Sequence, residues 1–139
     1  MAWLLVKKWQ SKWDLCSAQA KRRVWEMWKN SPFKEADWKY MRSIQKDLLN
    51  VLCSRINEQA VAIVNADSGT AHECYVNLFK HIGKSDRVVA VCFDDWRRSK
   101  LRELILSLRK HKLLKNSHIE NFSESGQAWI EQIEAELKQ

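Results

Sequence analysis

Turn-forming residues are scarce in this sequence of 139 residues, which has three glycines and one proline. Tight turns depend on these residues, so their scarcity excludes an all-β fold with many hairpins and favours long regular elements. The sequence also lacks an apolar run near the ~18 residues of a membrane span. Its first apolar residues precede Lys7 and Lys8, which is the reverse of the order in a signal peptide. We therefore expect a cytoplasmic protein with no membrane partner.

Closely paired cysteines are missing as well, because none of the four forms a C-x-x-C pair. Structural zinc sites usually show two such ligand pairs, and only His72 and Cys74 lie close together here. We therefore predict no metal and no cofactor, with reduced thiols at Cys16, Cys53, Cys74 and Cys92. Three scattered glycines also cannot supply a phosphate-binding loop. With no catalytic motif in view, the sequence favours a protein that is not an enzyme.

The remaining composition is that of an ordinary globular protein, with 45% hydrophobic and 29% charged residues. A chain of this length is expected to form one domain, residues 1–139. Within it we distinguish a basic, tryptophan-rich helical part (1–57) from a part in which strands and helices alternate (58–139).

The formal net charge of +7 is unevenly distributed. Residues 1–57 contain 12 basic and 5 acidic residues, whereas residues 58–139 contain 12 of each. A second basic segment, 97–115, has eight basic residues and one acidic residue, and the acidic tail can balance it. The N-terminal surplus has no such counterpart, so it indicates an anionic partner.

Apolar residues in the N-terminal half follow a helical period. Residues 3–29 predict an amphipathic helix whose apolar face consists of Trp9, Trp13, Cys16, Ala20, Val24 and Met27. A second helix, 33–57, is expected after the break at Pro32. Two helices joined by a short link should pack as an antiparallel hairpin.

Two segments rich in β-branched residues, 59–66 and 86–94, predict buried strands. A helical period of four also runs through the first of these segments, so a longer helix is the alternative there. Residues 117–122 suggest a third, short strand. The remaining periodic segments predict helices over 70–82, ended by Gly83, and over 97–111 and 125–137.

This order predicts a helix-rich α/β fold. The N-terminal antiparallel helical hairpin would pack on a small, mostly parallel sheet of two or three strands built from βαβ units. The alternative is a mostly α protein that ends in a winged helix-turn-helix. In that fold 97–111 would be the recognition helix and 115–123 the wing.

The leading functional hypothesis is a non-enzymatic protein that binds nucleic acid through the N-terminal half, which contains six of the eight tryptophans. Lysine and arginine bind phosphates, and aromatic rings stack on bases. The predicted phosphate-binding residues are Lys7, Lys8, Lys12, Lys21, Arg22, Arg23, Lys39 and Arg42. The alternative is a basic face that contacts only solvent.

A second hypothesis is a protein-interaction module or a homo-oligomer. Trp25, Trp28 and Trp38 cannot all share the apolar face of the first helix, so at least one of them is expected to be exposed or at an interface. This hypothesis needs no catalytic group.

A third hypothesis is a metal-dependent nuclease. Asp67 would end the first predicted strand, and Asp94 and Asp95 the second, so the carboxylates would converge if these strands were parallel neighbours. Magnesium takes such ligands, and phosphodiester hydrolysis uses them. The alternative is that Asp67 and Asp95 only cap the helices that follow.

Overall fold

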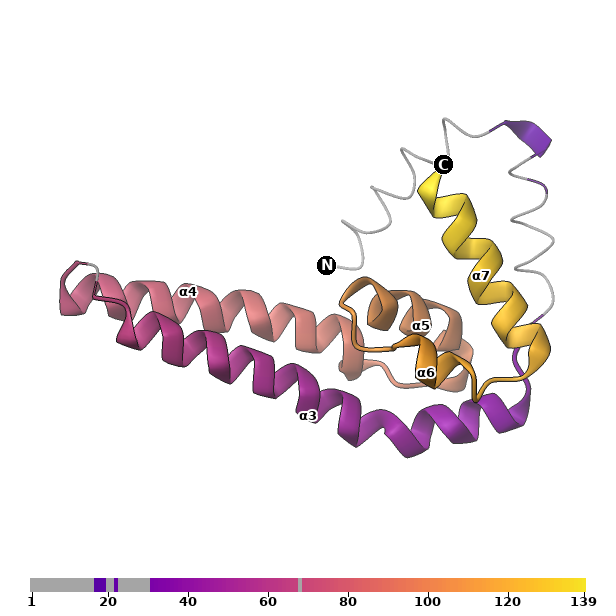
Figure 1. Cartoon of the computed structure of the whole chain (residues 1–139), viewed down its shortest axis with the longest axis horizontal. Helices are drawn as coiled ribbons and strands as arrows, with labels where there is room; N and C mark the ends of the chain where they lie inside the picture. Colours follow the sequence, from indigo (N-terminus) through magenta and orange to yellow (C-terminus); the bar gives the residue numbers. More distant parts are fainter. Residues whose placement is uncertain (1–16, 20–21, 23–30, 68) are drawn as a thin grey trace. The chain divides into compact units, whose positions relative to one another are not determined.

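The computed structural model describes residues 17–19, 22, 31–67 and 69–139. Every regular element in these residues is helical. In chain order the elements are α3 (Glu35–Asn65), α4 (Ala71–Val89), the π-helical turn η1 (Ala90–Asp94), the 3-10 turn η2 (Arg98–Lys100), α5 (Leu101–Lys110), α6 (Asn116–Ile119) and α7 (Glu124–Lys138) (Figure 1). The helices predicted over 97–111 and 125–137 are confirmed.

The predicted α/β fold with a parallel sheet is wrong, because the described part of the chain contains no strand. Residues 59–65 complete α3, Ala66 follows it, and residues 86–94 complete α4 and form η1. Residues 117–122 fall in α6 and the turn after it. Their β-branched residues favour strands locally, but the first two segments continue the apolar period of a helix, and packing along that period decides the outcome.

The alternative, a mostly α fold with a C-terminal winged helix-turn-helix, agrees better in helix content but fails at the wing. Residues 115–123 contain α6 and turns where a wing requires β-structure. The predicted N-terminal hairpin is only partly visible, since most of residues 3–29 lie outside the described residues. Its second helix is confirmed as part of α3, which continues to Asn65.

By its internal contacts the chain divides into two compact units, residues 1–42 with 116–139, and residues 43–115. Helix α3 contributes its first turns to one unit and the remainder to the other. The expectation of a single domain, residues 1–139, is not tested by this division and stays a prediction.

A buried carboxylate organises the first unit. Asp37, in the first turn of α3, is 1% exposed. It accepts hydrogen bonds from the backbone N–H of Lys34 (2.8 Å) and from the backbone N–H and hydroxyl of Ser123 (both 2.7 Å). Ser123 also caps α7 by accepting from the N–H of Gly126. Asp37 therefore joins the beginnings of α3 and α7.

Aromatic rings pack beside this carboxylate. Phe33 meets Phe122 and Trp129 edge to face, with ring centroids 6.1 and 5.3 Å apart. A Cβ atom added to Gly126 would lie 3.1 Å from a ring carbon of Phe33. Glycine at this position therefore allows α7 to approach the ring.

The core of the second unit is built around α5, which packs against η1. Its buried apolar side chains are Leu101, Leu104, Ile105 and Leu108. The helix ends in a Schellman motif, because Lys112 is left-handed (φ 57°) and the N–H of Leu113 donates to the carbonyl of Leu108 (2.9 Å). Arg55 of α3 donates to the carbonyls of His111 and Lys112, both at 3.0 Å. These bonds fasten the end of α5 to α3.

Helix α4 begins at a capping box that was not predicted from the sequence. The hydroxyl of Thr70 accepts from the N–H of Glu73, whose carboxylate accepts from the N–H of Thr70. The expected end at Gly83 is wrong, since α4 continues through this residue to Val89. Continuous apolar spacing on both sides of Gly83 outweighs the local preference of glycine for a helix end.

Gly83→Ala is expected to raise the free energy of unfolding by about 1 kcal/mol, because alanine is the better helix former. A Cβ atom at Gly83 would have no neighbour within 4 Å. Gly69→Ala is expected to act in the opposite direction, since Gly69 has φ +90° and an added Cβ would collide with the Glu73 carboxylate. Urea unfolding followed by circular dichroism measures both. A loss of stability in the Gly83 variant would contradict the helical assignment.

Candidate functional site

The second half of α3 and all of α4 form an antiparallel hairpin, here called the arm (residues 53–89) (Figure 1). Two side chains of α4 fix its register. The imidazole of His81 donates to the carbonyl of Ile56 (3.0 Å), and the Cys74 thiol contacts the carbonyl of Ile63 (3.6 Å). The seam between the helices follows coiled-coil spacing. Extended by this spacing from the two contacts, and judged by half-burial, the seam comprises Ile56, Ala60 and Ile63 on α3 with Cys74, Leu78, His81, Ser85 and Val88 on α4.

The side chains of this seam are too small and too polar to form a buried core. Alanine, cysteine, histidine and serine occupy positions where coiled coils place large aliphatic residues. Every seam residue is only half-buried. Between Leu52 and Cys92 no described residue is buried. The arm therefore extends as a helix pair without an interior of its own.

Large apolar side chains lie on one outer side of the arm. Tyr75, Phe79 and Ile82 are 64%, 69% and 47% exposed, and on α3 Val61 and Val64 are 58% and 54% exposed. Each of the five directly follows a seam residue. In an antiparallel helix pair such positions lie on the same side, so these residues share one surface, here called the apolar face.

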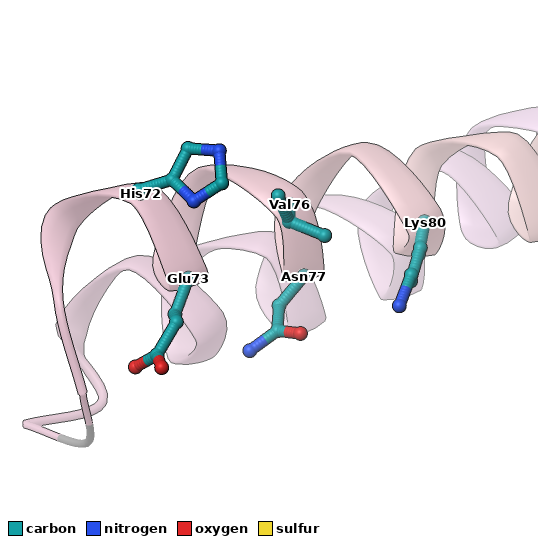
Figure 2. Close-up of a pocket in the computed structure, with 5 residues that line it drawn as sticks. All are labelled: His72, Glu73, Val76, Asn77 and Lys80. Atoms are coloured by element: carbon teal, nitrogen blue, oxygen red, sulfur yellow. The ribbon is translucent and has the colours of Figure 1, made fainter.

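The opposite side of the arm is polar. Residues that directly precede the seam on α4 are Glu73, Asn77, Lys80, Lys84 and Arg87, and all are exposed. Figure 2 shows Glu73, Asn77 and Lys80 projecting from the same side of α4. The arm therefore has an apolar outer side and a polar outer side, in addition to the seam between its two helices.

The arm is also electrically neutral, in contrast to the chain as a whole. Residues 53–89 contain four basic and four acidic residues, so the net charge of +7 lies elsewhere in the sequence. A neutral surface with exposed aromatic residues is typical of a protein interface and unsuited to binding phosphates.

A shallow hollow over α4 is lined by His72, Glu73, Val76, Asn77 and Lys80 (Figure 2). All five residues come from one helix, and none is buried. Small-molecule sites enclose most of their ligand. We therefore assign no small-molecule site to this hollow.

Most of the predicted nucleic-acid-binding residues lie outside the described residues: Lys7, Lys8, Lys12, Lys21 and Arg23. The others, Arg22, Lys39 and Arg42, are exposed. Lys39 and Arg42 lie three residues apart on α3, so their side chains neighbour one another.

The predicted interface tryptophans are similarly divided. Trp25 and Trp28 lie outside the described residues, and Trp38 is half-buried in the first turn of α3. The exposed aromatic residues of the arm, Tyr75 and Phe79, were not predicted as an interface. The signal in the sequence was a pair of parallel apolar rows on one helix: Tyr75 and Phe79 are spaced by four, and so are Cys74 and Leu78. Packing against one neighbouring helix requires a single apolar row, so the second row is left for another contact.

The structure does not bring the predicted catalytic carboxylates together. Asp67 follows α3, and Asp94 and Asp95 lie beyond the 19 residues of α4, at the end of η1. The rise of α4 and η1 along the helix axis places Asp67 and Asp94 roughly 35 Å apart. The convergence depended on neighbouring parallel strands, which are absent from the described residues.

Asp67 and Asp95 are not helix caps either. Thr70 caps α4, and Asp95 forms a two-pronged ion pair with Arg97 (2.5 and 2.9 Å). The hydrogen bond from Arg97 lowers the pKa of Asp95, and Asp95 in return raises the pKa of Arg97.

The described residues contain no group of three or more histidine, cysteine or acidic side chains that could hold a metal ion. Burial raises the pKa of the Cys92 thiol to about 11, with Lys110 opposing the shift. The thiol therefore stays protonated at neutral pH and is a poor nucleophile. Of the helices in the described residues, none combines the length and apolar character that a membrane span requires.

No protein-family model, curated protein or solved structure matches this chain. The function is therefore argued from geometry alone.

Proposed function

We propose that this protein is a protein-interaction module whose binding surface is the apolar face of the arm. The observation that carries the proposal is the absence of any buried described residue between Leu52 and Cys92, with Phe79 still 69% exposed. Amphipathic helices normally cover their apolar residues. Contiguous exposed apolar surface of this kind marks interaction sites in soluble proteins.

The free energy available at this face is sufficient for binding. Burying a large apolar side chain stabilises a complex by ~2 kcal/mol, and the face offers five of them. Phe79 lies between Tyr75 and Ile82 at the centre of the face along α4, where interface hot spots are usually found. Part of this gain offsets the entropy that association costs.

Photo-crosslinking tests the proposal. A benzophenone amino acid placed at Phe79 is expected to form a covalent adduct in cells that express the protein. The same amino acid at Asn77 is the matched control, because Asn77 is exposed on α4 but projects from the polar side (Figure 2). Adducts from position 79 and not from position 77 would support the proposal. Absence of an adduct at 79, or equal adducts at both positions, would contradict it.

We also propose a second function, nucleic-acid binding by the basic N-terminal half. The supporting observation is that Lys39, Arg42 and Arg22 are all exposed. Labelled oligonucleotides should bind at low salt. Lys39→Ala and Arg42→Ala each remove a cation that can bind a phosphate, so each variant should show a flatter salt dependence of the affinity. Fluorescence anisotropy at several salt concentrations measures both effects. Absence of binding at low salt would eliminate this function.

A further inference from the structure

We infer that the partner of the apolar face is a second copy of this chain, with the two α4 helices packed antiparallel about a two-fold axis at Phe79. This inference rests on the proposed interaction function and names its partner. It follows from the spacing of one row of side chains on α4, from their chemistry and from the charge of the arm.

The row consists of His72, Tyr75, Phe79, Ile82 and Asp86, at steps of three, four, three and four. All five are exposed. The row is close to symmetric about its centre. When a second α4 is laid across it antiparallel, Phe79 meets its own copy and Tyr75 meets Ile82 of the other chain. A two-fold interface requires this self-complementarity, because each residue then makes its contact twice.

The ends of the row are complementary as well. The same superposition places His72 of one chain beside Asp86 of the other, at both ends of the contact. An imidazole N–H donates to a carboxylate, so each end closes with a hydrogen bond at the rim of the apolar contact. A parallel pairing would instead place Asp86 beside Asp86. The antiparallel arrangement also sets the two helix dipoles head to tail.

Charge favours a second copy over a charged partner. Two chains of net charge +7 repel one another through their basic segments. The arm carries no net charge, so two arms can approach one another without this repulsion. A strongly acidic or basic partner would find no counter-charge on the apolar face, where Asp86 is the one charged residue of the row.

The area is adequate too. From their exposed fractions, the five apolar side chains offer on the order of 500 Å² per chain. With the polar residues between them, the surface approaches the ~800 Å² per partner of a standard stable interface. Two arms together would form a four-helix bundle, which supplies the interior that one arm lacks.

Sedimentation velocity of the full chain tests this inference. The unsubstituted chain is expected to sediment as a dimer that dissociates on dilution. Phe79→Glu should abolish the dimer, whereas Asn77→Glu, which adds the same charge on the polar side, should leave it unchanged. A chain that remains a monomer at all concentrations would overturn the inference.

A charge exchange tests the antiparallel register. His72→Glu and Asp86→Lys should each raise the dimer dissociation constant about tenfold, because the first places two carboxylates together at both ends and the second removes the acceptor of the His72 hydrogen bond at both ends. An equimolar mixture of the two variants should dimerise again, since one end of the mixed dimer pairs the new glutamate with the new lysine and the other end keeps His72 beside Asp86. Both substitutions favour the α4 dipole, glutamate near its beginning and lysine near its end, so weaker association cannot be ascribed to a damaged helix. Failure of the mixture to dimerise would refute the register.

The crosslinking experiment separates this inference from the proposed function. An adduct at position 79 of twice the chain mass supports both. An adduct of another mass, from a chain that sediments as a monomer, overturns the homodimer and leaves the interaction function standing. No adduct contradicts both.

Discussion

Asp37→Ala is expected to lower the free energy of unfolding by about 3 kcal/mol. The substitution removes a nearly inaccessible carboxylate that accepts three hydrogen bonds. The backbone N–H of Ser123 then has no partner, and an unsatisfied buried donor is destabilising in its own right. The Ser123 hydroxyl, which caps α7, is also deprived of its acceptor.

Thermal and urea unfolding at a fixed protein concentration measure this effect. Asp47→Ala is the matched control, because Asp47 lies on the same helix but is exposed, and its removal should cost well under 1 kcal/mol. Asp37→Asn should fall between them, since the amide oxygen still accepts one bond while its NH₂ group faces donors. Equal stability of the Asp37 and Asp47 variants would show that Asp37 does not hold the two helix starts together.

Leu108→Ala is expected to cost about 3 to 4 kcal/mol, because less apolar surface is buried and a cavity is left behind. Leu108 is 0% exposed at the end of α5, and its carbonyl accepts the N–H of Leu113 in the Schellman motif. In this motif the side chains of Leu108 and Leu113 are expected to pack together. The substitution therefore weakens both the core of the second unit and the end of α5.

Leu106→Ala makes the same chemical change on the same helix at a half-buried position. We expect it to cost about 1 kcal/mol, and the difference between the two variants isolates the effect of burial. Urea unfolding followed by tryptophan fluorescence measures both variants. Equal destabilisation would mean that Leu108 does not occupy a close-packed position.

The sequence predicted the helices with one strong apolar period and failed where local propensity opposed that period. The buried face of α5 was visible as Leu101, Leu104, Ile105 and Leu108. In 59–66 and 86–94, β-branched residues favoured strands, although the first segment also continued the period of α3. Which preference prevails depends on packing between helices far apart in sequence, and no local window contains that information.

The accuracy of the candidate sites depended on the accuracy of the predicted fold. The convergence of Asp67, Asp94 and Asp95 was predicted from neighbouring parallel strands, and the described residues contain no strand. The role of Asp37 is not visible in the sequence, because its partner Ser123 lies 86 residues away. The apolar face could not be predicted from the sequence either. Periodicity shows which residues share a side of a helix, whereas their exposure depends on which elements pack against that side.

The distribution of buried residues along α3 affects local unfolding of this helix. The helix is geometrically continuous over 31 residues, but its buried apolar residues, Met41, Leu48 and Leu52, all lie in its first two thirds. Local opening is easiest where it exposes little buried apolar surface. Backbone amides beyond Leu52 should therefore exchange with deuterated solvent much sooner than those before it. We expect one unbroken helix to open in two separate parts, and exchange protection beyond Leu52 would report when a partner covers the arm.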